Sequence, residues 1–140
     1  TQRLGFDYCS DTRGRCPFIP IYHGEIIACP QLPTTLPTLD EAIKSAGMEA
    51  AAEHVLNLST NPPATGHLYT LRAELEGMKL TPLFERLLQG WRAQGYELVA
   101  TRELYSSLET TKLPRHEVTL GKLPGSSETL MLQTKEFLAG

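Results

Sequence analysis

The chain has 140 residues, of which 41% are hydrophobic and 21% are charged, a balance typical of one globular domain or of a piece of a larger one. Its net charge of -3 at pH 7 provides no broad basic surface, so we expect no binding to nucleic acid. No apolar run approaches the roughly 20 residues that a helix needs to cross a bilayer.

The first element is predicted at residues 4–9, where LGFDYC reads as a short strand rich in aromatic residues. A core strand so near the first residue, Thr1, suggests a chain cut from something longer. A polar turn, SDTRG, follows. Residues 16–37 then hold five prolines, which remove backbone donors and restrict the residues before them. We therefore expect a proline-rich, apolar loop with room for one short strand at residues 25–29.

Helical signals begin at TLDEAI, where Thr38 and Glu41 match the pattern of a capping box. They predict a helix that runs to about residue 45 and ends near Gly47. A second helix, rich in alanine and glutamate, is predicted over residues 48–58.

The stretch HLYTLRA, residues 67–73, predicts a central strand. The strongest helix signal follows in TPLFERLLQGWRAQG, with Thr81 as the N-cap, Pro82 in the first turn and Gly95 at the end. Apolar residues recur in it at helical spacing: Phe84, Leu87, Leu88 and Trp91.

Shorter elements are predicted in the last third of the chain: a strand at residues 96–99, a helix capped by Thr101, one or two edge strands within residues 112–132, and a tail at residues 133–140. From Gly66 onward, the order strand, helix, strand, helix indicates an α/β fold with parallel strands, in an open sheet or a barrel. Functional sites then gather at the carboxyl ends of the strands, so SDTRG and RAELEG are expected to face the same opening.

Charged residues stand at both of these strand ends. Asp11 and Arg13 are interpreted either as a turn with a surface ion pair or as an orienting pair that holds a catalytic group. Arg72, Glu74 and Glu76 share one face of a strand. They form either a solvated strand edge or the floor of a polar pocket, in which Arg72 binds an anion or fixes a carboxylate.

The residue patterns alone contain no complete catalytic set. The four histidines form no close metal-binding pair, and no G-x-S-x-G or phosphate-binding glycine loop is present. Cys9, Cys16 and Cys29 form no CxxC motif and favour reduced thiols in a reducing compartment. A zinc site on these cysteines would need a fourth ligand and tighter spacing.

Several stretches together resemble the C-terminal half of the deformylases in the polysaccharide deacetylase family: SDTRG, PQLPTTLPTLDE, YTLRAELEG, LPRHEV and GKLPG. The resemblance covers nearly all 140 residues in the same order. It implies an α/β fold, with residues 1–140 forming the C-terminal part of a distorted (β/α) barrel. The N-terminal half of that barrel is then a partner of this chain.

The resemblance also implies an activity, the hydrolysis of a formamide on a lipid-linked amino sugar, an undecaprenyl-phosphate-linked 4-formamido-arabinose. This step belongs to lipid A modification and to resistance against cationic peptides. It takes place at the cytoplasmic face of the bacterial inner membrane, with peripheral membrane contact. The implied cofactor is a divalent metal, zinc or similar, whose ligands lie in the N-terminal half, so no metal ligand is expected in this chain.

Individual residues match the family pattern as follows. Asp11 matches an acidic residue that supports the catalytic histidine, and Arg13 follows it as in the deformylases. Arg72 stands where the deformylases have a histidine that acts as general acid. A guanidinium with a pKa above about 12 cannot transfer a proton at neutral pH. The chain alone is therefore expected to be inactive, although Arg72 could stabilise developing negative charge.

Three further residues are assigned to substrate binding: Glu74, and the apolar pair Ile26 and Ile27 in the proline-rich loop, which either meets the lipid-linked substrate or caps the barrel end. Two alternatives remain open. One is a non-catalytic relative that binds a sugar phosphate through Arg72 and Arg13. The other is a remnant with no independent fold, because half a barrel leaves strand edges unpaired.

Overall fold

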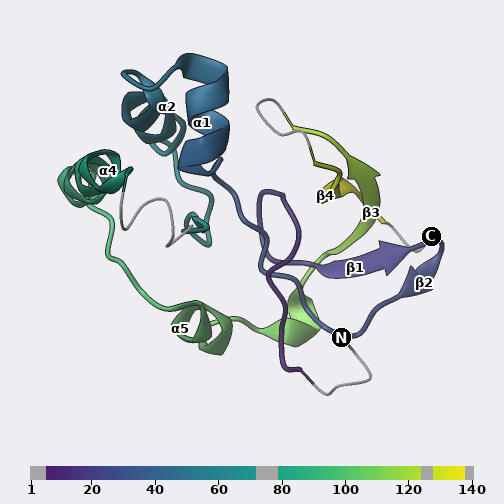
Figure 1. Cartoon of the computed structure of the whole chain (residues 1–140). Coiled ribbons are helices and arrows are strands. Elements are labelled where there is room, and N and C mark those ends of the chain that lie inside the picture. The colour runs from purple at the N-terminus through teal and green to yellow at the C-terminus, as the bar shows by residue number, and fades with distance from the viewer. Residues whose placement is uncertain (1–5, 72–78, 124–127, 138–140) are drawn as a thin grey trace.

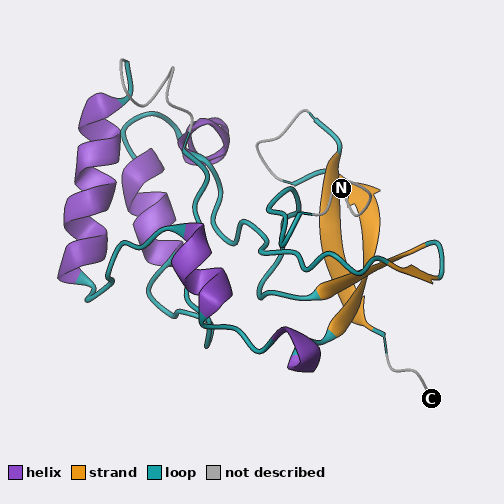
Figure 2. Ribbon diagram, turned by 90° about the horizontal axis from the view of Figure 1, so that it is seen from below, coloured by secondary structure: helices purple, strands orange, loops and turns teal. Residues whose placement is uncertain are grey.

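In the computed structural model, which describes residues 6–71, 79–123 and 128–137, the strands and the longer helices lie in two groups (Figures 1 and 2). Four strands form one sheet: β1 (Ile19–Tyr22), β2 (Glu25–Ile26), β3 (Arg115–Gly121) and β4 (Leu130–Glu136). Three helices pack together beside it: α1 (Leu39–Ala46), α2 (Ala51–Leu58) and α4 (Thr81–Ala93). The segment between α4 and β3 contains α5 (Thr101–Ser106) and a short 3-10 helix, η2 (Thr110–Lys112).

The sheet has the order β2-β1-β3-β4, and only the β1–β3 pair is parallel, with Ile19 beside Arg115. All the helices of the described residues lie on the long connection between these two strands. The predicted α/β class is confirmed. The prediction of edge strands within residues 112–132 is wrong for β3, which lies inside the sheet. The predicted tail at 133–140 is wrong for residues 133–136, which belong to β4.

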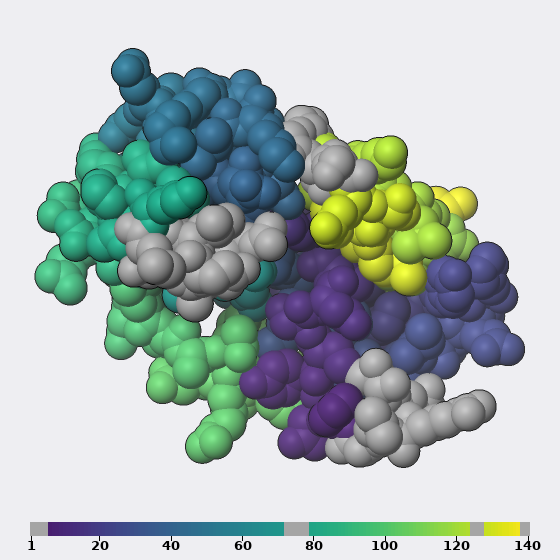
Figure 3. Space-filling model, in the orientation of Figure 1, coloured from purple at the N-terminus to yellow at the C-terminus, as the bar shows by residue number. Residues whose placement is uncertain are grey.

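The pairing extends beyond the named strands, because Arg13 pairs with the outer edge of β4, and the purple N-terminal segment lies beside yellow β4 in Figure 3. The backbone N–H of Arg13 donates to Met131 O at 2.9 Å, and Gln133 N–H donates to Arg13 O at 2.8 Å. This edge of β4 is therefore covered by a segment that lies more than a hundred positions earlier in the sequence.

Residues 9–14 pair in turn with residues 30–34: Thr34 N–H donates to Thr12 O at 3.0 Å. Gln31 exchanges two backbone hydrogen bonds, of 2.8 and 3.1 Å, with Phe18, the residue directly before β1. The hydrogen bonding thus passes from β1 to β3, to β4, to residues 9–14, to residues 30–34 and back to β1. These segments form a closed ring.

The proline-rich segment 16–37 is more regular than predicted, since it contains both β1 and β2. Pro20 contributes its carbonyl oxygen to Ile27 N–H at 2.9 Å, so its missing donor does not prevent a short strand. His23 and Gly24 have φ values of 51° and 80°. Two central residues with positive φ suit a two-residue hairpin, because that turn follows the twist of the strands.

Two predicted strands do not form in the described residues. Residues 67–71 of the expected central strand carry no strand, although Leu68 O accepts a hydrogen bond from Thr35 N–H at 2.9 Å. Residues 96–99 also form none, and Leu98 and Val99 are 62% and 53% exposed. A strand needs a partner ladder as well as suitable residues, and the described part of the chain provides none for residues 96–99. Of the strand expected at 4–9, the described part contributes one bridge, at Cys9.

The helices follow their sequence signals closely. The capping box at α1 is confirmed, and α2 is confirmed with a start three residues later than predicted. At α4, Pro82 lies in the first turn as predicted, but Leu80 rather than Thr81 occupies the N-cap. At α5, the N-cap is likewise Ala100 rather than Thr101.

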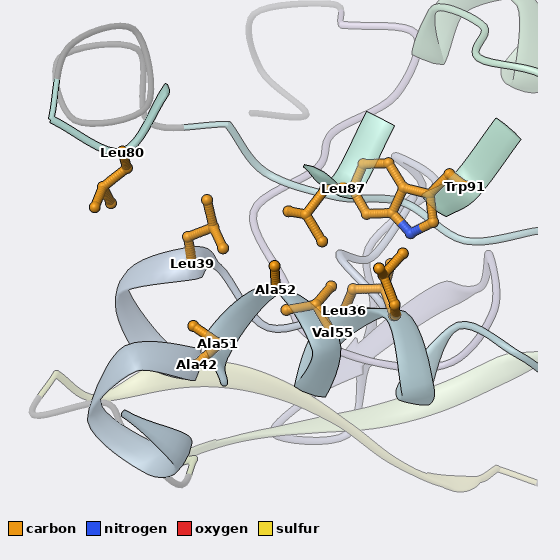
Figure 4. Close-up of a cluster of buried hydrophobic side chains, with 10 residues drawn as sticks. Leu36, Leu39, Ala42, Ala51, Ala52, Val55, Leu80, Leu87 and Trp91 are labelled. Carbon is orange, nitrogen blue, oxygen red and sulfur yellow. The ribbon is translucent and has the colours of Figure 1, made fainter. Parts of the chain in front are cut away.

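A hydrophobic core joins α1, α2 and α4 (Figure 4). The apolar stripe predicted for α4 faces this core, because Leu87 and Trp91 are buried and Phe84 and Leu88 pack partly buried against it. In Figure 4, Leu87 lies across from Ala52 and Val55 of α2. Among the described residues, no helix is both long and apolar enough to cross a membrane.

Candidate functional site

Arg13 lies where the ring of paired segments meets α1, and it forms a bidentate ion pair with Glu41. Its Nη1 donates to Oε1 at 2.8 Å and its Nη2 donates to Oε2 at 2.9 Å. The two side chains are only 16% and 9% exposed, so water screens this pair weakly. Because both terminal nitrogens already hold a carboxylate, the structure does not favour Arg13 as half of a free anion site.

Glu41 serves two partners at once. Its Oε1 also accepts a hydrogen bond from the backbone N–H of Thr38 at 3.3 Å, while its own N–H donates to Thr38 Oγ1 at 3.2 Å. The carboxylate that caps α1 is therefore the one that holds Arg13. The sequence pattern indicates the capping role only, because nothing in it links residues 28 positions apart.

Asp11 has a different partner. Its Oδ1 accepts a hydrogen bond of 2.6 Å from Gln31 Nε2, and Gln31 Oε1 accepts one of 3.2 Å from Thr12 Oγ1. Asp11 thus binds Gln31, and Arg13 binds Glu41. The surface-turn interpretation requires an ion pair between Asp11 and Arg13, and these two described side chains do not form one. The Asp11 side chain is exposed, whereas Gln31 is buried.

A cavity of about 620 Å³ lies beside the Arg13–Glu41 pair. Its volume falls in the range of about 300–1,000 Å³ that is typical of small-molecule sites. The walls come from the segments around Arg13 and Thr34, from α1 and α2, and from β4. Charged or titratable residues on them are Arg13, Arg15, Glu41, His54 and Lys135. Apolar walls are added by Leu36, Pro37, Leu58, Leu123 and Leu132, so the lining suits a molecule with both polar and apolar parts.

Arg72 and Glu74 lie outside the described residues, as does Glu76. The described residues directly before them lie near the cavity, because Thr70 Oγ1 and Thr34 Oγ1 are 2.7 Å apart and Thr34 lines the cavity. Thr34 also forms a bridge with Arg13. Of the two polar segments that were predicted to face one opening, SDTRG lies at the cavity through Arg13 and Gly14, whereas RAELEG lies outside the described residues.

Ile26 and Ile27 lie elsewhere, at the β1–β2 hairpin. Ile26 is 50% exposed on the edge strand β2, and Ile27 is half-buried. Neither side chain lines the cavity.

The described residues do not fit the divalent metal that the resemblance implies. No group of three or more histidine, cysteine, aspartate or glutamate side chains among them is placed to hold a metal ion. The histidines lie on separate parts of the fold: His23 in the β1–β2 turn, His54 on α2, His67 beside Thr35, and His116 buried on β3.

A second cavity, of about 300 Å³, lies between α4 and the extended segment 96–101. Its floor includes Tyr69 and Trp91, whose rings meet edge to face with centroids 5.2 Å apart. His67 also lines it, and burial lowers the pKa of this ring. The sequence analysis assigned no binding role to any residue of this cavity, because it is bounded in part by two segments that were predicted as strands.

Curated proteins similar in sequence to this chain include two that share one name. One, the probable 4-deoxy-4-formamido-L-arabinose-phosphoundecaprenol deformylase ArnD of Shewanella sediminis (strain HAW-EB3), is 35% identical over 103 residues, which cover 74% of this chain and 32% of that protein. The protein of the same name from Wigglesworthia glossinidia brevipalpis is 28% identical over 134 residues, which cover 96% of this chain and 46% of that protein. No family model matches the chain. The chain thus spans less than half the length of these relatives, and its resemblance to the deformylases is confirmed.

Proposed function

We propose that the chain is the C-terminal part of a deformylase, which hydrolyses the formamide of an undecaprenyl-phosphate-linked 4-formamido-arabinose and releases formate. The observation that carries the proposal is the similarity to two relatives whose names state this activity, with 35% identity over 103 residues for the first. The reaction serves lipid A modification at the cytoplasmic face of the inner membrane.

In this proposal, the chain forms the C-terminal part of a distorted (β/α) barrel. The parallel β1–β3 pair and the helices on its connection support that architecture. An N-terminal half completes the barrel and brings the base and the ligands for the divalent metal. The chain by itself has no deformylase activity in this proposal, because the base and the metal ligands lie in the N-terminal half.

Asp11 and Arg13 have distinct roles in this proposal. The exposed carboxylate of Asp11 accepts a hydrogen bond from a histidine of the N-terminal half and sets the orientation of that ring. Arg13 acts through its ion pair with Glu41, which fixes the backbone of residues 9–14 against α1. Arg13 is therefore a positioning residue.

Arg72 determines the rate of amide cleavage. The amine that leaves a formamide must gain a proton, and a guanidinium does not release one at neutral pH. Arg72 instead stabilises negative charge that develops on the formyl oxygen, with Glu74 beside the sugar. A longer protein with Arg72 is therefore slower than one with histidine at this place.

A hybrid protein tests the proposal. This chain replaces the matching segment of the S. sediminis relative, and formate release is measured for the hybrid, for its Arg72→His variant and for the unaltered relative. We expect the Arg72→His variant to be faster than the hybrid by about 10²–10⁴-fold, the usual contribution of general acid catalysis. Equal rates in two hybrids that melt at the same temperature would contradict the assignment of Arg72. Formate release by the 140-residue chain alone would contradict the need for the N-terminal half.

The hairpin residues Ile26 and Ile27 make peripheral contact with the membrane or with the lipid of the substrate. The exposure of Ile26 supports this, because an apolar side chain on an edge strand gains from a nonaqueous neighbour. Replacement of both by serine in an active hybrid is expected to raise KM for the lipid-linked substrate and to leave kcat nearly unchanged. Serine at Leu98 and Val99, which are 62% and 53% exposed and thus more exposed than Ile26, serves as the control. A KM that rises equally in both double variants would refute the role.

A further inference from the structure

Two cysteine thiols are held side by side at the start of the ring. The Sγ atoms of Cys9 and Cys29 are 3.4 Å apart, and both cysteines are free. The backbone places them there: Cys9 N–H donates to Pro30 O at 2.9 Å, and Leu32 N–H donates to Cys9 O at 2.8 Å. Their proximity thus follows from the pairing of residues 9–14 with residues 30–34.

Only a small movement separates this arrangement from a covalent bond. A disulfide has an S–S length of about 2.05 Å, so the sulfurs must approach by about 1.4 Å. Rotation about χ1 of a cysteine moves its sulfur by more than this distance.

We propose that Cys9 and Cys29 are a modification site at which peroxide forms a reversible intramolecular disulfide. The proposal rests on the geometry of the thiols and is independent of the deformylase activity. In a reducing compartment the resting form is the dithiol, and peroxide shifts it to the disulfide.

The chemistry runs in two steps. The Cys9 thiolate attacks one oxygen of hydrogen peroxide, so that an S–O bond forms, the O–O bond breaks, and the released hydroxide takes a proton to become water. The sulfur of Cys29 then attacks the Cys9 sulfur. The S–S bond forms, the S–O bond breaks, and the hydroxyl leaves as water with the proton of Cys29. Two thiols lose two electrons and two protons, and one peroxide becomes two waters.

The exposure of the two sulfurs assigns their order of reaction. Cys9 is half-buried, so peroxide can reach it, whereas Cys29 is only 5% exposed. Burial and the hydrogen bond with Cys9 raise the pKa of Cys29 to about 11, which keeps it a thiol at neutral pH. Cys9 is therefore oxidised first, and Cys29 resolves it.

The bond ties the segment that carries Asp11 and Arg13 to residues 30–34. It closes a loop between positions 20 apart, and a loop of this size restricts the unfolded chain. We expect oxidation to raise the Tm of the chain by on the order of 10 °C.

Cys16 provides a matched control. It is also half-buried, but its sulfur accepts a hydrogen bond from Gln133 Nε2 at 3.5 Å and stands apart from the pair. Its loops to the other two cysteines are shorter than the loop between Cys9 and Cys29, so an unfolded chain favours disulfides that include Cys16.

The experiment treats the reduced 140-residue chain with hydrogen peroxide, alkylates the remaining thiols, and maps disulfides by peptide mass spectrometry. The wild type is expected to form a Cys9–Cys29 peptide with one alkylated thiol, at Cys16, and a dithiol reductant is expected to reverse it. Cys16→Ser is expected to form the same disulfide and the same rise in Tm. The single variants Cys9→Ser and Cys29→Ala are expected to form neither.

A parallel sample oxidised in concentrated urea shows whether the fold selects the pair, since disulfides that include Cys16 are expected to predominate there. The proposal is overturned if Cys16→Ser melts as the wild type does yet forms no intramolecular disulfide. It is also overturned if the chain without urea forms mainly disulfides of Cys16.

Discussion

Arg13 donates two hydrogen bonds to the carboxylate of Glu41, at 2.8 and 2.9 Å, and so joins the ring of strands to the first turn of α1. The same carboxylate accepts a hydrogen bond from the N-cap residue Thr38. One side chain therefore stabilises a helix end and a contact between the two groups of elements.

Glu41→Gln isolates the ion pair, because glutamine can keep the capping contact but carries no charge. It leaves a largely buried guanidinium without its counter-charge. We expect a loss of about 1–3 kcal/mol in the free energy of unfolding, measured with urea. Glu109→Gln is the control, since Glu109 pairs with Lys112 at 2.8 Å but is 68% exposed, and it is expected to cost under about 1 kcal/mol. Equal losses for the two variants would show that the Arg13 pair adds no stability beyond that of a surface pair.

The N-cap hydroxyl of Thr38 can be tested apart from its methyl group. Thr38→Val removes the hydroxyl that accepts from Glu41 N–H, and it is expected to destabilise the chain by about 1–2 kcal/mol. Thr38→Ser keeps the hydroxyl and loses one methyl group, which costs about 0.8 kcal/mol. Both losses are measured as free energies of unfolding in urea. A serine variant less stable than the valine variant would argue against the capping role.

Gly90 on α4 packs against Leu56 on α2. A Cβ at Gly90 would lie 2.5 Å from both Cδ atoms of Leu56, which is itself buried. Gly90→Ala is therefore expected to lower stability by about 1 kcal/mol, because overpacking of about 1–3 kcal/mol exceeds a helix-propensity gain of about 1 kcal/mol. In a Leu56→Ala background the clash is gone, so the same change is expected to raise stability. The double-mutant cycle is measured by urea unfolding, and the same sign in both backgrounds would rule out the predicted contact.

The half-buried ring of His67 makes stability depend on pH. Burial lowers its pKa in the folded chain, and the backbone of Asn61 partly opposes that shift. The unfolded chain takes up the proton near the ordinary value of about 6.5, whereas the folded chain resists it. This contribution to stability is thus complete above about pH 6.5 and is lost as the pH falls below it. We expect Tm to drop on mild acidification and His67→Gln to reduce that drop. If the His67→Gln variant keeps the full dependence of Tm on pH, other titratable groups cause that dependence.

The two possible oxidation states of the cysteines matter for each of these measurements. The Cys9–Cys29 contact belongs to the same pairing of residues 9–14 with 30–34 that positions Arg13. Unfolding experiments are therefore best made with a reductant present, so that the dithiol form alone is compared between variants.

The sequence alone determined those features whose partners lie within one turn of a helix. Thr38 and Glu41 are three positions apart, and their capping box forms as predicted. The ends of α4 also depend on local features. Pro82 suits the first turn because it lacks a backbone donor, and Gly95 follows the helix with a φ of 90°. Helical hydrogen bonds join residues four apart, so the local pattern contains nearly all the information that they need.

The tertiary structure decided which extended segments become strands and which side chains meet. Ile19 pairs with Arg115, and the residues predicted as a strand at 96–99 have no partner strand among the residues that the structure describes. Arg13 meets Glu41, and Cys9 meets Cys29, across 28 and 20 positions. Strand pairing and ion pairing depend on neighbours brought together by the whole fold, because an extended segment cannot satisfy its own backbone groups.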